Sequence, residues 1–311
     1  MIACIQRLTT LGIVVCATFI LYLVWETSRI AAWALFFAIL LSHCIVLALQ
    51  FVALPWINAA DVPPRATYRQ LLSAWFQESV AAAQVFAWWQ PFRAQRFPDQ
   101  LICKGEVHGN RGVILVHGFL CNRAVWMRWL PELTRHKVPF VALNMEPVFG
   151  AIDGYVGILD KAIKDMHAVT GQAPLLVCHS MGGLVARAWY QTSSARDSSI
   201  HRIVTIGSPH HGTRIGSGFP KFSWIKNVDQ MRHGSRWLAS LALKETAAQL
   251  RQFTCYYSNC DNIVMPAGTA KLEGADNRFV AGIPHVAMVL DGGIMRETIA
   301  MLHDFSPQGV N

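Results

Sequence analysis

Residues 175–187 read LLVCHSMGGLVAR, an apolar run that passes through a short turn into a segment compatible with a helix. Residues 175–177 have the composition of a buried parallel strand. Ser180 stands in the turn, and Gly182 follows two residues later. A serine on a sharp strand–turn–helix connection exposes its hydroxyl, provided that small neighbours let strand and helix pass closely. We therefore predict a nucleophilic serine at position 180, with an ordinary buried serine as the alternative.

The stretch departs at one position from the Gly-x-Ser-x-Gly pattern of such turns, because Cys178 replaces the first glycine by another small residue. Together with residues 116–119 (VHGF) and 207–213 (GSPHHGT), the sequence resembles the α/β-hydrolase superfamily and, within it, the bacterial lipase-like members. The resemblance covers residues 112–304. It implies an α/β-hydrolase fold, which is a mostly parallel sheet flanked by helices with a lid or cap insertion. We expect no cofactor.

Strand and helix patterns alternate on both sides of the serine, which is typical of a largely parallel sheet. We expect further strands at residues 112–116, 139–143, 202–206, 253–257 and 278–281. The expected helices cover residues 124–136, 155–169, 181–191 and 293–303. These elements make up a predicted catalytic domain over residues 101–311. Residues 214–250 interrupt the alternation of strands and helices as an insertion.

Two uncharged apolar runs precede this domain, at residues 8–25 and 30–49. Each is long enough to cross the hydrocarbon core of a bilayer as a helix. A cleaved signal peptide would explain the first run alone, and two buried helices of a soluble protein would need polar faces, which neither run has. We therefore predict two transmembrane helices that form a hairpin within residues 1–57, with the lipid bilayer as a partner.

The arginines around the two runs predict the orientation of the hairpin. Arg7 precedes the first run, Arg29 lies between the runs, and Arg65 and Arg69 follow the second. Segments rich in Lys and Arg stay on the cytoplasmic side of a membrane. Three arginines against one therefore place the catalytic domain on the cytoplasmic face of a bacterial inner membrane.

Residues 58–100 form a predicted linker helix, in which apolar residues recur at helical spacing between residues 67 and 90. Trp88 and Trp89 lie near its end. Two interpretations stay open. The helix covers the hydrolase core, or it lies at the membrane interface with its tryptophans at the level of the headgroups.

The net charge of +8 does not indicate a nucleic-acid partner, because the 27 Lys and Arg residues are scattered and no nucleic-acid motif is present. A mild attraction to anionic membrane surfaces explains the charge better. The eight cysteines show no metal-type spacing. Cys255 and Cys260 are close enough in sequence for a local disulfide, although free thiols are the simpler expectation.

A serine nucleophile needs a base, and the base needs an acid that orients it. The resemblance implies the chain order serine, acid, histidine. We choose His285 over His303 as the base, because His285 directly follows a strand and a Gly-Ile-Pro turn. Asp261, in the segment DNIVMP, resembles the acid loop of the family; the competing carboxylates are Asp229, Asp276 and Asp291.

By position, the backbone N–H groups of Met181 and Phe119 form the expected oxyanion hole, which stabilises the negative charge of the tetrahedral intermediate. In the family, histidines at the positions of His117 and His179 are structural, and we assign them the same role.

Two features bear on metal binding. The pair His210-His211 suggests a metal site at first sight, but adjacent extended residues point to opposite sides. Some bacterial lipases hold a calcium ion partly through an Asp two positions after the catalytic histidine, and this chain has Ala287 there. We therefore predict no metal site.

The insertion at residues 214–250 is either a mobile lid over Ser180 or a fixed cap that shapes the acyl pocket. Three of its residues could serve as hinge points: Gly216, Gly218 and Pro220. Five others supply apolar surface: Phe219, Phe222, Trp224, Trp237 and Leu238.

The sequence thus predicts a membrane-anchored serine hydrolase that cleaves carboxylic esters, with acyl lipids as the expected substrates. A thioesterase or an amidase would use the same residues, because fold does not determine substrate. A non-catalytic, membrane-tethered binding protein on a hydrolase scaffold is the alternative of another class. The oligomeric state stays open.

Overall fold

A computed structural model describes residues 1–61, 63–101, 111–192, 197–217 and 225–302. Its centre is a six-stranded sheet in the order β2-β1-β3-β4-β5-β6, and every neighbouring pair is parallel. The strands are β1 Val113–Val116, β2 Phe140–Ala142, β3 Leu175–His179, β4 Arg202–Ile206, β5 Phe253–Tyr257 and β6 Asp276–Phe279. The predicted parallel sheet is confirmed. Only β6 begins earlier than expected, at Asp276 instead of residue 278.

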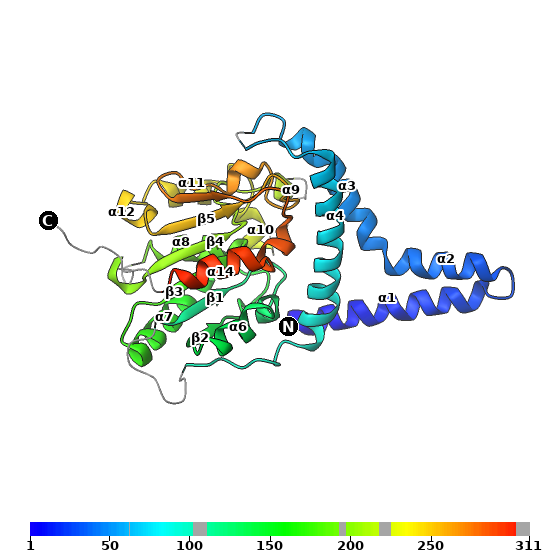
Figure 1. Ribbon diagram of the computed structural model, residues 1–311, viewed down its shortest axis with the longest axis horizontal. Helices are drawn as coiled ribbons and strands as arrows, with labels where there is room; N and C mark the ends of the chain where they lie inside the picture. Colours follow the sequence, from blue (N-terminus) through cyan, green and yellow to red (C-terminus); the bar gives the residue numbers. More distant parts are fainter. Residues whose placement is uncertain (62, 102–110, 193–196, 218–224, 303–311) are drawn as a thin grey trace.

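Helices cover both faces of the sheet, as Figure 1 shows. Successive residues of a strand point to opposite faces. On β1, Ile114 and Val116 accordingly pack with α7 and α8, whereas Val113 and Leu115 pack with α6, α13 and α14. The helices of this domain are η2 Arg123–Trp126, α6 Trp129–Arg135, η3 Ile152–Tyr155, α7 Val156–Thr170, α8 Met181–Trp189, η4 Asp197–Ser199, η5 Ala267–Ala270, α13 His285–Val289 and α14 Gly292–Ala300.

The chain begins with three apolar helices, α1 Ile2–Val24, α2 Arg29–Leu40 and α3 Ser42–Ile57. Among the described residues, α1 is the one helix that is long and apolar enough to cross a membrane. Only 6% of its most apolar stretch of 18 residues is buried. Helices α2 and α3 meet this test only together and are bent by 58° at Leu41. The expected second apolar helix at residues 30–49 is thus broken at Leu41, and by length and composition the bent pair is either one broken span or a re-entrant loop. Helices α1 and α2 form a hairpin that protrudes from the sheet domain (Figure 1).

Contacts with the following helix explain the bend between α2 and α3. His43 Nε2 lies 3.3 Å from the carbonyl oxygen of Ser79, and Trp75 Nε1 donates to the carbonyl of Cys44 over 2.8 Å. These polar contacts lie just after the bend at Leu41. They fix α3 along the sheet domain while α2 remains with α1 in the hairpin (Figure 1).

The linker is a continuous helix made of α4 Tyr68–Ala82, the π-helical segment η1 Ala83–Trp89 and α5 Gln90–Phe92. A capping box between Thr67 and Gln70 begins it. One face packs on the sheet domain through Ala81 and Val85, which confirms that the helix covers the core. The opposite face leaves a row of large apolar side chains exposed: Tyr68, Leu72, Phe76, Val80 and Trp88. We call α1 to α5, residues 1–92, the N-terminal module.

The described part of the insertion consists of α9 Arg214–Ser217, α10 Lys226–Gln230, α11 Arg236–Ala242 and α12 Ala247–Leu250. Leu238 and Leu241 belong to the hydrophobic core, so this part is packed on the domain. Glu245 forms a buried bidentate ion pair with Arg187 of α8, at 2.6 and 2.8 Å. Five residues of the lid hypothesis lie outside the described residues: Gly218, Phe219, Pro220, Phe222 and Trp224.

Candidate active site

Ser180 occupies a strained turn between β3 and α8. Its backbone angles, φ 54° and ψ −124°, lie in a region that residues with a side chain rarely adopt. Gly182 makes the turn possible, because a Cβ atom at that position would lie 2.4 Å from the carbonyl oxygen of Val116. Cys178 is fully buried at the position of the missing glycine. The local geometry is that of a nucleophile elbow.

Asp261 and His285 come from two different loops and meet in a buried ion pair. Asp261 follows β5, and its Oδ1 atom accepts hydrogen bonds from the backbone N–H groups of Ile263 and Val264 over 2.9 and 2.8 Å. Its Oδ2 atom lies 3.0 Å from Nδ1 of His285, at the start of α13. This geometry fits an Nδ1–H that donates to the carboxylate, which leaves Nε2 as the basic nitrogen.

The ion pair lies beside the serine elbow. The N–H of Ser180 donates to the carbonyl of Ile206 over 2.9 Å. The next residue, Gly207, is so close to the pair that an added Cβ would lie 3.0 Å from Asp261 Oδ2 and 3.1 Å from His285 Nδ1. No hydrogen bond joins Ser180 to the His285 imidazole within the described chain. In ligand-free hydrolases this contact is often long and tightens only when substrate binds.

The surroundings of His285 favour its protonated form. Burial alone lowers the pKa of the imidazole, but the negative charge and hydrogen bond of Asp261 raise it, with a further contribution from Glu78. The net result is a pKa above the ordinary value of 6.5. A base with these neighbours is well suited to take a proton from a serine hydroxyl and to hold it as an imidazolium.

The loop after β1 lies directly against the nucleophile. A Cβ atom on Gly118 would come within 2.7 Å of the Ser180 Cβ, so only glycine fits there. Phe119 follows Gly118, and Met181 follows Ser180. Neither of their backbone N–H groups has a hydrogen-bond partner in the part of the chain that is described. Two free donors next to a nucleophile can bind an oxyanion.

His117 holds this loop in place. Its Nδ1 lies 2.8 Å from the carbonyl oxygen of Gly118, and its Nε2 accepts from the N–H of Met145 over 3.0 Å. Burial lowers the pKa of His117 to about 4, so the ring is neutral near pH 7. His179 is also buried, and burial lowers its pKa well below the usual range. Both rings have the surroundings of structural histidines.

The other candidates are placed elsewhere. Asp229 pairs with Arg232, Asp276 pairs with Arg278, and Asp291 caps α14 by accepting from two backbone N–H groups. His303 lies outside the described residues. Within the described ranges, no group of three or more His, Cys, Asp or Glu side chains could hold a metal ion. Cys255 and Cys260 are free thiols.

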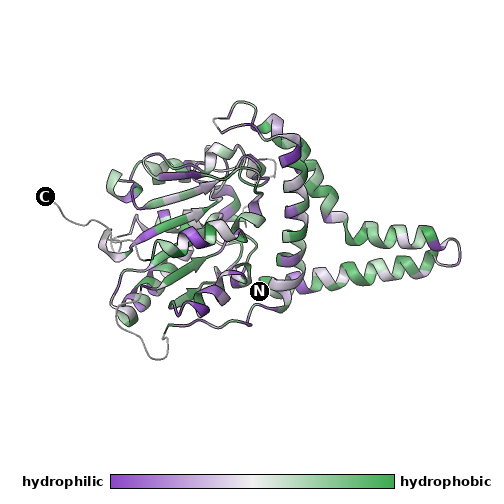
Figure 2. Ribbon diagram, in the orientation of Figure 1, coloured by the Kyte–Doolittle hydropathy of each residue, from purple (hydrophilic) through white to green (hydrophobic). Residues whose placement is uncertain are grey.

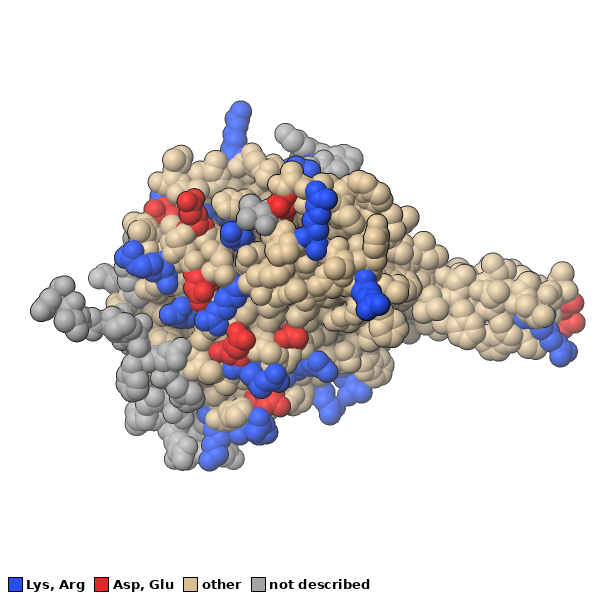
Figure 3. Space-filling model, turned by 45° about the horizontal axis from the view of Figure 1, so that its top comes forward, with Lys and Arg blue, Asp and Glu red and all other residues tan. Residues whose placement is uncertain are grey.

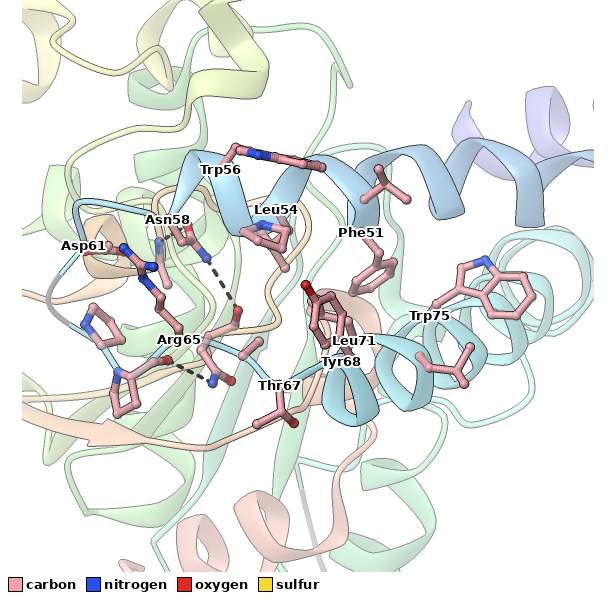
Figure 4. A pocket seen from close by; sticks show the side chains of 18 of the residues that line it. Phe51, Leu54, Trp56, Asn58, Asp61, Arg65, Thr67, Tyr68, Leu71 and Trp75 are labelled. Carbon is pink, nitrogen blue, oxygen red and sulfur yellow. Dashed lines mark hydrogen bonds between the residues drawn. The ribbon is translucent and has the colours of Figure 1, made fainter.

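A cavity of about 860 Å³ lies behind the acid loop, between α3 and the start of α4 (Figure 4). Its walls are mostly apolar, with Phe51, Leu71 and Trp75 among them. Asn259 and Ala267, on either side of Asp261 in sequence, also line it. The N-terminal module therefore borders the loop that carries the candidate acid.

Comparisons with known proteins support the fold. A sequence profile of the PGAP1-like alpha/beta domain matches residues 150–254, a span that contains Ser180 but neither Asp261 nor His285. No curated protein sequence matches the chain. With six parallel strands and an elbow after β3, the chain has an α/β-hydrolase fold.

Solved structures of lipases and esterases are similar to this chain. The mature lipase BlEst2 of Bacillus licheniformis aligns at a TM-score of 0.54 and 14% identity, over 62% of this chain and 92% of that one. Aspergillus fumigatus lipase B aligns at 0.53 and 17% identity, over 63% of this chain and 53% of that one. The metagenomic carboxyl esterase MGS0156 aligns at 0.50 and 12% identity, over 62% and 75%. Identities this low support the fold alone.

The structure adds one residue to the site that the sequence did not indicate. Glu78 of α4 is fully buried, and its carboxylate accepts from the backbone N–H groups of Val286 and Ala287, directly after His285. A single Glu within an amphipathic helix has no local signature of such a role. The one available signal was its position among apolar residues that recur at helical spacing.

Proposed function

We propose that this chain is a membrane-bound serine hydrolase that cleaves carboxylic esters of acyl lipids. In this mechanism Ser180 attacks the ester carbonyl while His285 takes its proton, and Asp261 stabilises the imidazolium. The N–H groups of Phe119 and Met181 bind the oxyanion. The alcohol leaves with the proton from His285, and water then hydrolyses the acyl-enzyme by the same route.

The observation that carries this proposal is the buried Asp261–His285 pair beside a serine on a strained elbow. Strained backbone at a side-chain-bearing residue costs about 1–3 kcal/mol and persists where function requires it. The 3.0 Å Nδ1–Oδ2 contact favours the tautomer that carries its proton on Nδ1, which is the one a serine hydrolase needs. Neither feature is needed for a scaffold that only binds.

The exposed apolar surface of the N-terminal module supports lipids as substrates. Figure 2 shows the protruding hairpin as almost uniformly hydrophobic, and Figure 3 shows charged side chains at its tip and over the globular part. Next to the hairpin, α3 exposes Leu49, Val52 and Trp56. Exposed apolar patches of this kind mark contacts with membranes or proteins. A bilayer would cover this surface and bring acyl esters to the domain.

The same arrangement supports the proposed orientation. Arg7, at the base of the hairpin, donates from its guanidinium to the carbonyl of Pro91, and Arg93 follows close by. Arg29 lies at the tip, after Glu26. More positive charge lies at the base than at the tip, which favours a cytoplasmic catalytic domain. Digestion of that domain by protease added outside intact spheroplasts would refute this orientation.

The function is tested with a fluorophosphonate probe on the full chain in detergent. The probe labels an activated serine covalently, so the wild-type chain should react and Ser180→Ala should not. A non-catalytic scaffold predicts no labelling of either. A series of p-nitrophenyl esters of increasing acyl length, compared with matched thioesters and anilides, then separates an esterase from a thioesterase or an amidase.

A further inference from the structure

Glu78 connects the N-terminal module to the candidate base. It lies on the inner face of α4, with 1% of its surface exposed. Both carboxylate oxygens lie 3.0 Å from the N–H of Val286, and Oε2 also accepts from the N–H of Ala287 over 3.1 Å. These two N–H groups belong to the first turn of α13, which begins at His285. The carboxylate thus holds the backbone immediately after the imidazole.

Two successive hydrogen bonds connect α3 of the same module to the backbone N–H of His285 through Asn262 of the acid loop. The N–H of His285 donates to Oδ1 of Asn262 over 3.3 Å. The amide of Asn262 in turn donates to Oε1 of Gln50, on α3, over 2.8 Å. The backbone of the base is therefore held at three successive N–H groups by side chains that α3 and α4 either supply or support.

The charge of Glu78 is costly at this depth. Burial raises its pKa to about 7, against the opposing effects of the two N–H groups and of His285. The ionisable groups that face it are His285 and Asp261, with His43 of α3 near the next residue of α4. His285 is also in contact with the buried ring of His179, with 4.8 Å between the ring centroids. A neutral amide could accept the same N–H bonds without this desolvation cost. The carboxylate therefore points to a role for its charge.

We propose that Glu78 is a positioning residue for His285, which fixes the first turn of α13 through the Val286 and Ala287 N–H groups and stabilises the imidazolium with its negative charge. This role rests on the proposed function of His285 as the base. It also connects catalysis to the membrane, because the opposite face of α4 exposes Leu72, Phe76 and Val80. A shift of α4 on a lipid surface would move Glu78 relative to the imidazole.

Glu78→Gln separates charge from packing, because the amide keeps the size and one acceptor oxygen. Gln77→Ala, on the exposed face one residue away, is the matched control. We measure kcat/KM for a short soluble p-nitrophenyl ester against pH, per site titrated with fluorophosphonate. Removal of a nearby negative charge lowers the pKa of an imidazole. We expect the acid limb of this pH profile to move about half a pH unit or more toward lower pH and the plateau value of kcat/KM to fall about tenfold.

A merely structural role predicts another outcome. In that case Glu78→Gln lowers the thermal midpoint and the titratable fraction, while the acid limb of the remaining active enzyme stays where the wild type has it. That result overturns the proposal. So does a shift of equal size in Gln77→Ala.

A second measurement does not depend on activity. The pKa of His285 is followed by NMR of ¹⁵N-histidine-labelled protein in detergent, and His285→Asn assigns the signal. A lower pKa in Glu78→Gln than in the wild type supports the proposal, and an unchanged value refutes it. If the wild type neither reacts with the probe nor cleaves esters, the proposed function fails, while this titration still decides whether Glu78 acts on His285.

Discussion

Strand β3 and helix α1 are both strongly apolar, yet they lie in opposite environments. All five residues of β3 are buried between two layers of helices. In α1 only Ile2 and Ala17 are buried, and Val15 and Phe19 expose more than half of their surface. Burial of apolar surface stabilises by about 25 cal/mol per Å². Strand β3 has this stabilisation, whereas α1 would lack it in water. The comparison shows that an apolar sequence alone does not determine burial, and it fits the proposal that lipid covers α1.

The largest expected effect tests whether the chemistry belongs to the sheet domain. Ser180→Ala should lower kcat at least about a thousandfold, because it removes the nucleophile. The protein should keep its thermal midpoint and its membrane binding. Esterase assays on purified protein measure the loss, and near-full activity in this variant would contradict the assignment.

Asp261→Asn and His285→Ala should slow probe labelling severely as well, because each removes a part of the proton transfer to and from Ser180. Asp276→Asn is the matched control, because Asp276 begins β6 at the opposite end of the parallel strands. A greater loss of probe labelling in Asp276→Asn than in Asp261→Asn would identify Asp276, and not Asp261, as the acid.

The next effect concerns the stability of the sheet domain. Glu245→Gln should lower the free energy of unfolding by about 3 kcal/mol, since it leaves the buried Arg187 guanidinium without its charged partner. Denaturant titration of the full chain in detergent measures this. The control is Glu297→Gln, which removes a partly exposed pair with Arg278 and should cost about 0–1 kcal/mol. Equal losses in both variants would show that burial does not determine the strength of these pairs.

Val15→Lys should have little effect on the sheet domain but should weaken the membrane binding of the hairpin. A lysine in the middle of a membrane helix costs about 2.5–3.5 kcal/mol, so the share of protein in the membrane fraction should fall. Probe labelling of the detergent-solubilised chain should stay within about twofold of the wild type, because the substitution lies far from Ser180. Val15→Leu is the control. Unchanged membrane binding of the lysine variant would show that α1 is not in contact with lipid.

The smallest effect concerns the acid limb of the wild-type pH profile, which is the pH range in which activity falls as the pH is lowered. A protonated imidazole cannot accept the serine proton, and the surroundings of His285 raise its pKa above 6.5. Activity should therefore fall as the pH drops through a value above 6.5, instead of through the ordinary value. A pH profile of kcat/KM with a short soluble ester measures it. An acid limb below pH 6.5 would mean that the Asp261 charge does not dominate in solution.

The sequence predicted the sheet domain better than the N-terminal module, and the reason is physical. The strand around Ser180 and the turn beyond it follow from local sequence, because burial and tight turns select the residues within the segment itself. The contacts beside the bend at Leu41 join His43 to the carbonyl of Ser79 and Trp75 to the carbonyl of Cys44, pairs that lie more than 30 residues apart and meet only in the folded chain. Hydropathy alone could not distinguish this broken helix from a straight span. Glu78 escaped notice for the same reason.

The π-helical segment η1 has a consequence for helical phase. Glu78 and Gln90 are twelve residues apart and would point about 120° apart in an uninterrupted α-helix. The wider turns of η1 bring both onto the buried face, where Gln90 accepts from the N–H of Asn122 over 2.7 Å, three residues after Phe119. One helix thereby holds the loop of the candidate base and the loop of the candidate oxyanion hole in a fixed rotational relation. The extra residue in η1 sets that phase, and a further insertion there would turn Gln90 about 100° away from its loop while Glu78 stayed in place.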